Sequence, residues 1–158
     1  MTEILEFSAE VQRDIFGSKD NYVRKIEKDL EVAVIARDGV IKVTGDEPNV
    51  RKAVSILENL AGLSRIGGEI EDQSVDYTIE MKDEAQPGML VDFDKDIICH
   101  TVSGKPIKPK TLGQKKYIDS IRNNLIVFAN GPAGTGKTFL AILVFFITNH
   151  LAVFLVVL

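Results

Sequence analysis

One run of eight residues constrains the fold of this chain more than any other feature. It matches the pattern G-x-x-x-x-G-K-T and reads Gly131-Pro132-Ala133-Gly134-Thr135-Gly136-Lys137-Thr138. The apolar run Leu125–Ala129 precedes it and predicts a strand buried on both faces of a parallel sheet. The residues that follow it predict a helix. A strand, a glycine-rich loop and a helix in this order are the context of a phosphate-binding loop.

The chemistry of phosphate binding explains the residue types in this run. Glycines adopt backbone angles closed to other residues and let main-chain amides approach phosphate oxygens. We expect the amides from about Gly134 to Thr138 to form an anion nest, to which the positive end of the following helix adds. Lys137 is expected to reach the β- and γ-phosphates, and the Thr138 hydroxyl to bind Mg²⁺. The predicted cofactors are ATP, or another nucleoside triphosphate, and Mg²⁺.

The composition is that of a folded chain in a reducing compartment. Hydrophobic residues make up 45% of the 158 residues, which is enough for a packed core. The one cysteine, Cys99, cannot form an internal disulfide, and the acidic start Met1–Glu6 lacks the apolar run of a secretory signal. Cys99, His100 and His150 lack the spacing of a metal site and are expected to be structural. The expected location is the cytoplasm.

Charge is distributed unevenly along the chain. Residues 1–66 carry a net charge of −2, residues 67–96 of −8 and residues 97–158 of +6, for a total of −4. The basic third contains the glycine-rich run, and its charge favours polyanions. The alternative is that its lysines are solvated surface, namely Lys105, Lys108, Lys110, Lys115 and Lys116.

Residues 21–63 predict a compact αββα unit. The apolar positions of Asn21–Leu30 form a helical stripe. Residues 32–36 and 41–43 alternate between apolar and polar side chains, as strands do. Asp38-Gly39 lies between them and is a two-residue hairpin signal.

A long helix is predicted to close this unit. Asp46 can cap its start, and Pro48 fits its first turn. Its apolar positions recur at helical spacing, and it is expected to end by Gly62 or, at the latest, by Gly67-Gly68.

Residues 67–106 predict a linker between two more regular regions. The segment is acidic and is interrupted by Pro87-Gly88 and by Gly104-Lys105-Pro106. The strand-like runs Val75–Ile79 and Asp96–His100 indicate one or two hairpins within it. Regular structure is expected to resume after Lys110.

A helix is predicted between this linker and the apolar run before the glycine-rich loop. Thr111 or Gly113 can open it, and it is expected to continue through Ile121. Tyr117, Ile118 and Ile121 would lie on one side of this helix.

Three stretches together resemble the PhoH-like ATPases. They are Ile107-Lys108-Pro109-Lys110-Thr111-Leu112-Gly113-Gln114-Lys115-Lys116-Tyr117, the run Gly131–Thr138, and Phe139-Leu140-Ala141. The likeness is close over about residues 100–141 and extends more loosely over residues 1–66. It implies a P-loop ATPase related in fold to superfamily 1 RNA helicases, with a KH-like N-terminal domain and a link to RNA metabolism.

The order of elements after Phe16 matches the KH part of that resemblance. A KH domain grips single-stranded RNA with a GXXG loop. The corresponding residues here are Gly17-Ser18-Lys19-Asp20, in which an aspartate replaces the second glycine and adds a negative charge. The alternative is an αββα packing domain without RNA binding.

The resemblance also implies a role for Gln114, which lies 17 residues before Gly131. In helicase-like relatives, a glutamine before the phosphate loop recognises adenine, because its amide both donates and accepts a hydrogen bond. The alternative is a solvent-facing helix glutamine.

The resemblance ends after about Ala141, and Phe139–Leu158 contains no charged residue. Three interpretations stay open for this tail: a transmembrane helix, a buried helix to about Ile147 followed by a buried strand over Leu151–Leu158, and unselected sequence from a truncated or frameshifted gene. An uncharged tail favours association, so a fragment that ends near residue 66 is expected to be more soluble.

The sequence therefore predicts an α/β protein with three parts. These are a small KH-like α+β domain over residues 1–66, an acidic linker over residues 67–106 and the first part of a P-loop NTPase domain, with a parallel sheet, over residues 107–158. The expected function is ATP binding, with hydrolysis in the complete family member, coupled to RNA metabolism. The alternative is a noncatalytic fragment that acts at most as a KH-like RNA-binding module. ATP and single-stranded RNA are the expected partners, DNA and a membrane are not expected, and the resemblance allows an oligomer of the full-length protein.

Overall fold

The structure is a computed structural model, and it describes residues 1–37, 39–83 and 88–148. The chain divides into two compact units, which we call the N-terminal unit, Met1–Asp92, and the C-terminal unit, Phe93–Leu158. These units reflect packing within the chain. The domain boundaries after residues 66 and 106 stay predictions.

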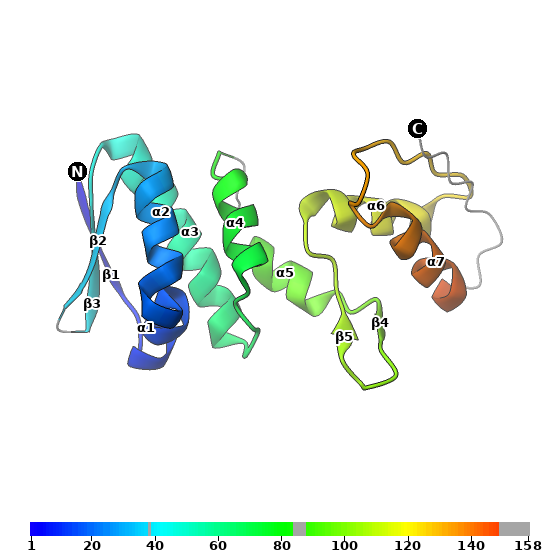
Figure 1. The fold of residues 1–158 in the computed structure, drawn as a ribbon, viewed down its shortest axis with the longest axis horizontal. Coiled ribbons are helices and arrows are strands. Elements are labelled where there is room, and N and C mark those ends of the chain that lie inside the picture. The colour runs from blue at the N-terminus through cyan, green and yellow to red at the C-terminus, as the bar shows by residue number, and fades with distance from the viewer. Residues whose placement is uncertain (38, 84–87, 149–158) are drawn as a thin grey trace. The chain divides into compact units, whose positions relative to one another are not determined.

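The N-terminal unit is an α+β structure built on a small antiparallel sheet. Its strands lie in the order β1-β3-β2 (Figure 1), with bounds β1 Thr2–Glu6, β2 Ala33–Arg37 and β3 Val40–Thr44. Leu5 pairs with Ile41 across β1 and β3, and Val34 pairs with Val43 across β2 and β3. The alternation expected for residues 32–36 and 41–43 is confirmed at Val34, Ile41 and Val43, which are buried, whereas Ala36 is exposed.

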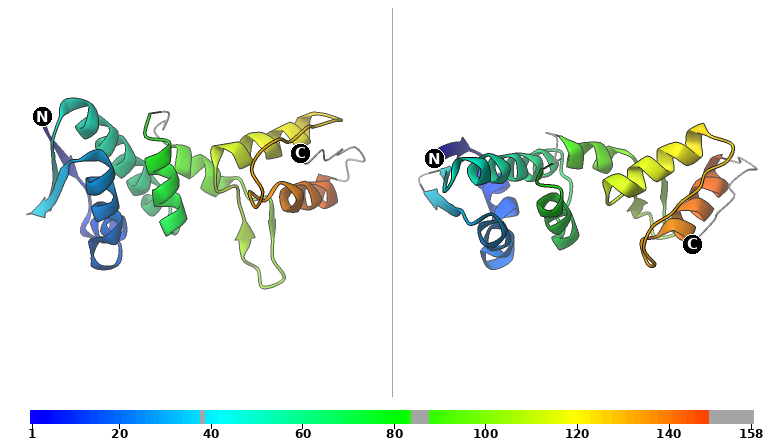
Figure 2. Two further views of the ribbon diagram at one scale, coloured as in Figure 1. Left: turned by 45° about the horizontal axis from the view of Figure 1, so that its top comes forward. Right: turned by 90° about the horizontal axis from the view of Figure 1, so that it is seen from above.

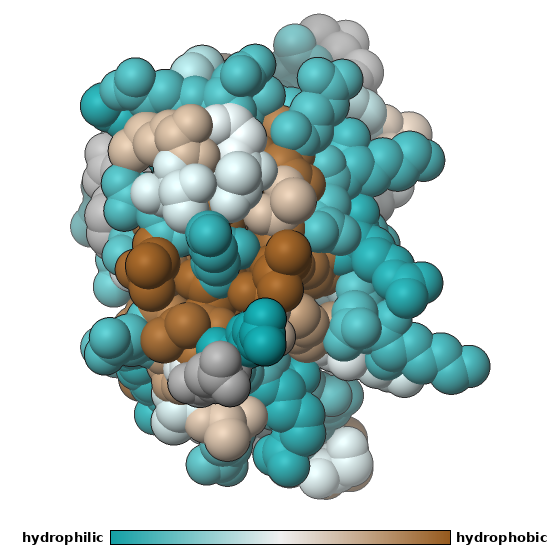
Figure 3. All heavy atoms as spheres, turned by 90° about the vertical axis from the view of Figure 1, so that its left-hand side faces the viewer, coloured by the Kyte–Doolittle hydropathy of each residue, from teal (hydrophilic) through white to brown (hydrophobic). Residues whose placement is uncertain are grey.

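The helices of this unit cover one face of the sheet, as both views in Figure 2 show. They are α1 Ala9–Phe16, the 3₁₀ turn η1 Ser18–Asp20, α2 Asn21–Leu30 and α3 Glu47–Arg65. Helix α4 Asp72–Glu80 packs on α2 and α3, and α5 Met89–Lys95 crosses the boundary between the units. The other face of the sheet is exposed, with Ile4 and Ile35 about 60% accessible. Figure 3 looks onto that face, where hydrophobic side chains (brown) lie among hydrophilic ones (teal).

The predicted helix over Asn21–Leu30 is confirmed as α2, whose stripe of Val23, Ile26 and Leu30 is buried. The predicted hairpin is also present, since Arg37 pairs with Val40 and leaves a two-residue connection. Gly39 in that connection has a φ of +84°, and Asp38 lies outside the described residues.

Helix α3 follows the predicted start and ends between the two predicted stops. Pro48 lies in its first turn, but the Asp46 side chain makes no capping hydrogen bond. The helix continues through Gly62 to Arg65. Gly67 has a φ of +74°, and the Gly67 and Gly68 amides donate to the carbonyls of Ser64 and Leu63. These two bonds form a Schellman motif, which terminates the helix.

The prediction of a strand over Val75–Ile79 is wrong, because this segment lies in α4. Val75 and Ile79 are four residues apart and both buried, as residues on one helix face are. Lys25 of α2 pairs with Asp72 and Asp76 of α4 at 2.8 and 2.7 Å, which ties the two helices together. The first half of the expected linker is therefore part of the N-terminal unit.

The C-terminal unit contains a short hairpin and two helices. Their bounds are β4 Cys99–His100, β5 Pro106–Ile107, α6 Leu112–Asn123 and α7 Lys137–Thr148. This hairpin agrees with the one or two hairpins expected between residues 67 and 106. Helix α6 confirms the helix expected through Ile121.

The expected buried strand at Leu125–Ala129 is not formed in the structure. The segment is irregular, and Leu125 and Phe128 are 73% and 74% accessible. A strand exists only when a neighbour accepts and donates its backbone hydrogen bonds, and none of the described strands pairs with this segment. The described residues accordingly contain antiparallel sheets and no parallel sheet.

The tail lies partly outside the described residues. Helix α7 reaches Thr148, which agrees with a helix to about Ile147, and the expected strand over Leu151–Leu158 falls in the part not described. Within the residues that the structure describes, no helix has the length and apolar character needed to span a bilayer.

Candidate phosphate-binding site

The N-terminus of α6 is fixed by a side-chain cap. Thr111 has extended backbone angles, and its hydroxyl accepts a hydrogen bond from the backbone N–H of Gln114 at 3.2 Å. Of the two residues predicted to open this helix, the structure therefore selects Thr111. This cap sets the position of the first turn of α6, from which the Gln114 side chain projects.

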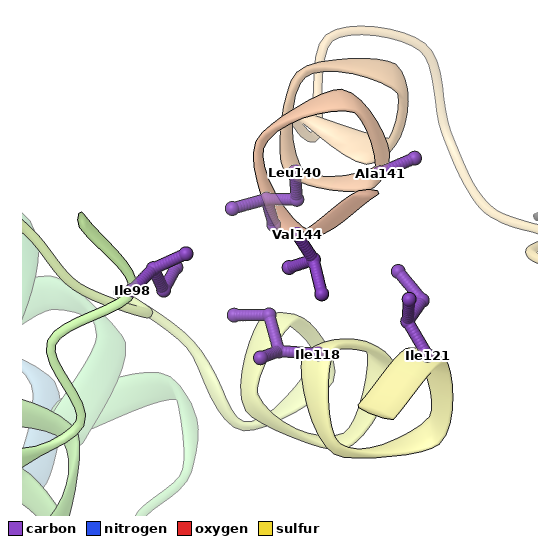
Figure 4. Packing of buried hydrophobic residues seen from close by; sticks show 6 residues of the cluster. All are labelled: Ile98, Ile118, Ile121, Leu140, Ala141 and Val144. Carbon is purple, nitrogen blue, oxygen red and sulfur yellow. The ribbon is translucent and has the colours of Figure 1, made fainter. Parts of the chain in front are cut away.

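A small apolar core holds α6 against α7. Six buried residues form it, namely Ile98, Ile118, Ile121, Leu140, Ala141 and Val144. In Figure 4 the side chains of Ile118 and Ile121 point from α6 toward α7. The start of α7, and with it the glycine-rich run, is thereby anchored by packing on α6.

Charged side chains that flank this core also fix α6. The carboxylate of Asp96 contacts Lys115 at 2.9 Å and Arg122 at 2.9 Å. Burial raises the pKa of Asp96, but the hydrogen bonds from Lys115 and Arg122 outweigh it, so its pKa is lowered from the ordinary value. The hydrogen bonds that Lys115 donates to Asp119 and Asp96 raise the pKa of Lys115 in turn.

These ion pairs reduce the positive charge available to a polyanion. Lys108 pairs with Asp94, and Lys115 with Asp96 and Asp119. The charges of Lys108 and Lys115 are therefore neither free to attract a polyanion nor simply solvated. Both lysines are structural ion-pair partners.

The backbone of the glycine-rich run has the conformation that glycine permits. Gly134 and Gly136 have φ values of +80° and +83°, so other L-residues at either position would be strained. Gly131 and Gly134 have open space where a Cβ would lie, so the loop is accessible from outside. Alternating left-handed glycines ahead of a helix are the arrangement from which an anion nest is made.

Lys137 lies against the beginning of the loop. Its ammonium donates to the carbonyl oxygens of Gly131 at 2.8 Å and Pro132 at 2.7 Å, and lies 3.3 Å from the Thr135 hydroxyl. The Thr135 hydroxyl donates to the Pro132 carbonyl at 3.1 Å. The side chain of Lys137, which the sequence predicts to bind the phosphates, thus donates its hydrogen bonds to the loop itself.

Gln114 is also brought to the loop. Its amide nitrogen donates to the Thr135 carbonyl at 3.3 Å, and its amide oxygen accepts from the Lys110 backbone N–H at 2.8 Å. The sequence did not predict the contact with Lys110, and the adenine-recognition role of Gln114 stays a prediction. The alternative of a purely solvent-facing glutamine does not describe these contacts.

The expected magnesium ligand, Thr138, lies exposed in the first turn of α7. Among the described residues, no cluster of three histidine, cysteine or acidic side chains could hold a metal ion. One hydroxyl is enough only where phosphate oxygens and water supply the remaining ligands, as they do for nucleotide-bound Mg²⁺. Cys99 and His100, in the short strand β4, belong to no such cluster.

A second concave feature lies in the N-terminal unit beside the turn Gly17–Asp20. It is a pocket of about 420 Å³ lined by Arg13, Asp14, Gly17, Ser18, Tyr22, Gly68, Glu69 and Ile70. Lys19 and Asp20 have φ values of 56° and 60°, the left-handed conformation that favours glycine. Asp20 stands where a GXXG loop has its second glycine. Its backbone has the conformation that favours glycine, but its side chain is charged.

Comparison with known proteins identifies relatives over most of the chain. The family model described as "PhoH-like protein" matches residues 106–148, which extends past Ala141. The PhoH-like protein of Bacillus subtilis (strain 168) is 37% identical over 128 residues, covering 81% of this chain and 40% of the relative. That of Mycobacterium tuberculosis (strain ATCC 25618 / H37Rv) is 33% identical over 130 residues, covering 80% and 36%.

A more distant relative, the PhoH-like protein of Synechocystis sp., is 27% identical over 125 residues. The chain thus spans less than half the length of the curated relatives it matches. No solved structure matches significantly.

Proposed function

We propose that this chain, which belongs to the PhoH-like protein family, binds ATP together with Mg²⁺ through residues 131–138. The observation that carries the proposal is the geometry of the loop at the start of α7. Gly134 and Gly136 are left-handed, and α7 begins at Lys137. The first amides of a 12-residue helix and the amides of the loop then face the same anion.

Each residue of the loop has a distinct part in this proposal. The glycines at 131, 134 and 136 keep the loop free of side chains, so that phosphate oxygens reach the amides. Pro132, Ala133 and Thr135 complete the turn. Lys137 exchanges its contacts with the Gly131 and Pro132 carbonyls for phosphate oxygens, which are stronger acceptors because they are charged. The Thr138 hydroxyl contributes one ligand to Mg²⁺.

Hydrolysis of ATP is proposed for the whole family protein. Phosphoryl transfer needs, besides the loop, an acidic metal ligand and a group that orients the attacking water. No Asp, Glu, Arg or Gln occurs after Thr138 in this sequence. We therefore expect this chain to bind ATP without turning it over at an appreciable rate.

Calorimetric titration of the full chain with Mg²⁺ and ATP tests the proposal. The parent chain should bind, and Lys137→Ala should remove detectable binding. Lys116→Ala, an exposed lysine on α6, is the matched control and should leave the affinity unchanged. Equal affinities of the parent and Lys137→Ala chains would overturn the phosphate-loop assignment.

Binding of single-stranded RNA by the N-terminal unit is a second candidate function. It is supported by the element order β1-α1-η1-α2-β2-β3-α3 and by the pocket beside Gly17–Asp20, with Arg13 on its wall. Asp14 and Glu69 also line that pocket, so binding should be weak. If the loop binds no nucleotide, the chain is best described as a noncatalytic RNA-binding module.

Anisotropy of a labelled single-stranded RNA measures this second function. Affinity should fall steeply between 50 and 200 mM salt, because phosphate contacts release counterions. Arg13→Ala should weaken binding further, and a single-stranded DNA of the same sequence should bind less well. Absence of binding at the lower salt concentration would exclude the RNA-binding role.

A further inference from the structure

Both polar atoms of the Gln114 amide are engaged by the protein itself. The amide oxygen accepts from the Lys110 N–H at 2.8 Å, and the amide nitrogen donates to the Thr135 carbonyl at 3.3 Å. Lys110 lies before the cap of α6, and Thr135 lies within the loop 21 residues beyond Gln114. The side chain thus links the segment before α6 to the middle of the glycine-rich run.

The contact with Thr135 places Gln114 where the loop changes direction. Thr135 lies between the two left-handed glycines, Gly134 and Gly136. A Cβ built on Gly136 would lie 3.7 Å from the Gln114 amide nitrogen, so the glutamine packs beside this residue as well. The Thr135 hydroxyl in turn contacts the Lys137 ammonium at 3.3 Å.

Resting on the ATP-binding function proposed above, we infer that Gln114 is a positioning residue for the phosphate loop. It holds the Thr135 carbonyl and thereby the orientation of the neighbouring loop amides. Its effect then falls on the phosphate chain and is the same for every nucleoside triphosphate. This differs from adenine selection, in which the amide of Gln114 would contact the base.

The two roles use different hydrogen-bonding positions of the side chain. Recognition of adenine uses one amide donor and the amide oxygen. The amide oxygen already accepts from Lys110 and the nitrogen already donates to Thr135. A base could therefore use only the second amide hydrogen and the second oxygen lone pair, while the contacts with Lys110 and Thr135 that position the loop stay in place.

Inorganic tripolyphosphate separates these roles, because it carries the phosphates without a base. The full chain is titrated with Mg²⁺ and ATP, GTP or tripolyphosphate as parent, Gln114→Ala and Gln114→Glu. Glutamate keeps an acceptor for Lys110 but cannot donate to Thr135. We expect Gln114→Ala to bind all three compounds more weakly by a similar factor, roughly three- to tenfold for one lost hydrogen bond. Gln114→Glu should lose at least as much for all three, because its carboxylate also repels the phosphates.

The ratio of ATP to GTP affinity decides between the roles. Positioning predicts that this ratio is unchanged in both variants. If the variants lose affinity for ATP alone and bind tripolyphosphate like the parent, Gln114 reads the base and the inference is wrong. Parental affinity for all three compounds would also overturn it. Gln73→Ala, an exposed glutamine in the N-terminal unit, is the matched control and should change nothing.

Hydrogen exchange without any ligand tests the positioning independently of nucleotide binding. Amides in residues 131–137 should exchange faster in Gln114→Ala than in the parent, while amides of α3 stay unchanged. If none of the three compounds binds the parent chain, the ATP-binding function fails, but faster exchange of the loop still supports positioning. Unchanged exchange of the loop would overturn it.

Discussion

The N-terminal and C-terminal units differ in how completely they bury their apolar side chains. The N-terminal unit surrounds a continuous core, in which Ile15, Ile26, Ile41, Ile56, Leu57 and Leu60 are fully inaccessible. The C-terminal unit has a cluster of six buried residues. Beside that cluster it exposes large apolar side chains, namely Leu125, Ile126, Phe128, Phe139 and Phe146, each more than half accessible.

This difference indicates that the N-terminal unit is stabilised by contacts within itself to a greater extent than the C-terminal unit. Helices α1 to α4 contact one another within residues 1–92, and α2 and α3 also contact the sheet. The C-terminal unit has more apolar surface than its described elements cover, and such surface favours association with other molecules. The candidate phosphate loop lies in this less completely packed unit.

The largest effect is expected from separating the two units. A fragment of residues 1–92 should fold cooperatively, and a fragment of residues 93–158 should associate or stay unfolded. A shorter fragment of residues 1–66 should be less stable by roughly 3 kcal/mol or more, because it lacks the buried side chains Val75 and Ile79 of α4, which packs on α2 and α3. Urea unfolding followed by circular dichroism measures the first and third fragments, and sedimentation measures the second.

A monomeric, cooperatively folding fragment of residues 93–158 would contradict this comparison. Equal stability of the two N-terminal fragments would contradict the assignment of α4 to the N-terminal unit.

A smaller effect is expected from Asp96→Asn, which weakens the ion pairs that fix α6. The loss should be about 1–2 kcal/mol at pH 7, because Lys115 and Arg122 lose a charged acceptor. The folded pKa of Asp96 is lowered, so its stabilising effect is complete above the ordinary value of 3.8 and is lost as the pH falls through the folded pKa. Hydrogen exchange of α6 amides at pH 7 and below pH 3.8 measures the difference.

Glu58→Gln, a carboxylate exposed on α3, serves as the control for a general effect of charge. If Asp96→Asn keeps α6 as protected as in the parent at pH 7, the ion pairs do not hold the C-terminal unit together.

The smallest effect is expected from Tyr117→Phe. The Tyr117 hydroxyl is buried and has no hydrogen-bond partner among the described residues, and burial raises the pKa of Tyr117. Removing an unsatisfied buried hydroxyl should leave stability unchanged or raise it by up to about 1 kcal/mol. Thermal unfolding measures the change. A loss of more than about 1 kcal/mol would mean that the hydroxyl makes a stabilising bond.

Local patterns in the sequence predicted elements whose partners lie nearby in the chain. Helix α2 and the β2–β3 hairpin follow from an apolar stripe, a strand alternation and Asp38-Gly39. The same reasoning missed β1 and α1, because Thr2–Glu6 is mostly polar and its partner β3 lies some 40 residues away. It assigned Val75–Ile79 to a strand, because a five-residue run of this kind fits a period of two as well as one helical turn.

In the candidate site, too, local sequence patterns predicted some features and missed those that depend on packing. The position of Gly131–Thr138 ahead of a helix follows from its spacing, and the structure brings Gln114 beside it. The contacts of Gln114 with Lys110 and Thr135 depend on how α6 packs on α7, which no local pattern contains. The apolar run Leu125–Ala129 predicted a strand from composition alone, but a strand also needs neighbours to pair with.

Hydrogen exchange of the full chain with and without Mg²⁺ and ATP tests the central claim most directly, since it reports where the nucleotide binds. If residues 131–138 bind the phosphates, amides from Gly134 to Thr138 should exchange more slowly with ATP, and Lys137→Ala should abolish this protection. The N-terminal unit should exchange at the same rate in both conditions. Binding of ATP that protects other segments and leaves residues 134–138 unchanged would contradict the phosphate loop.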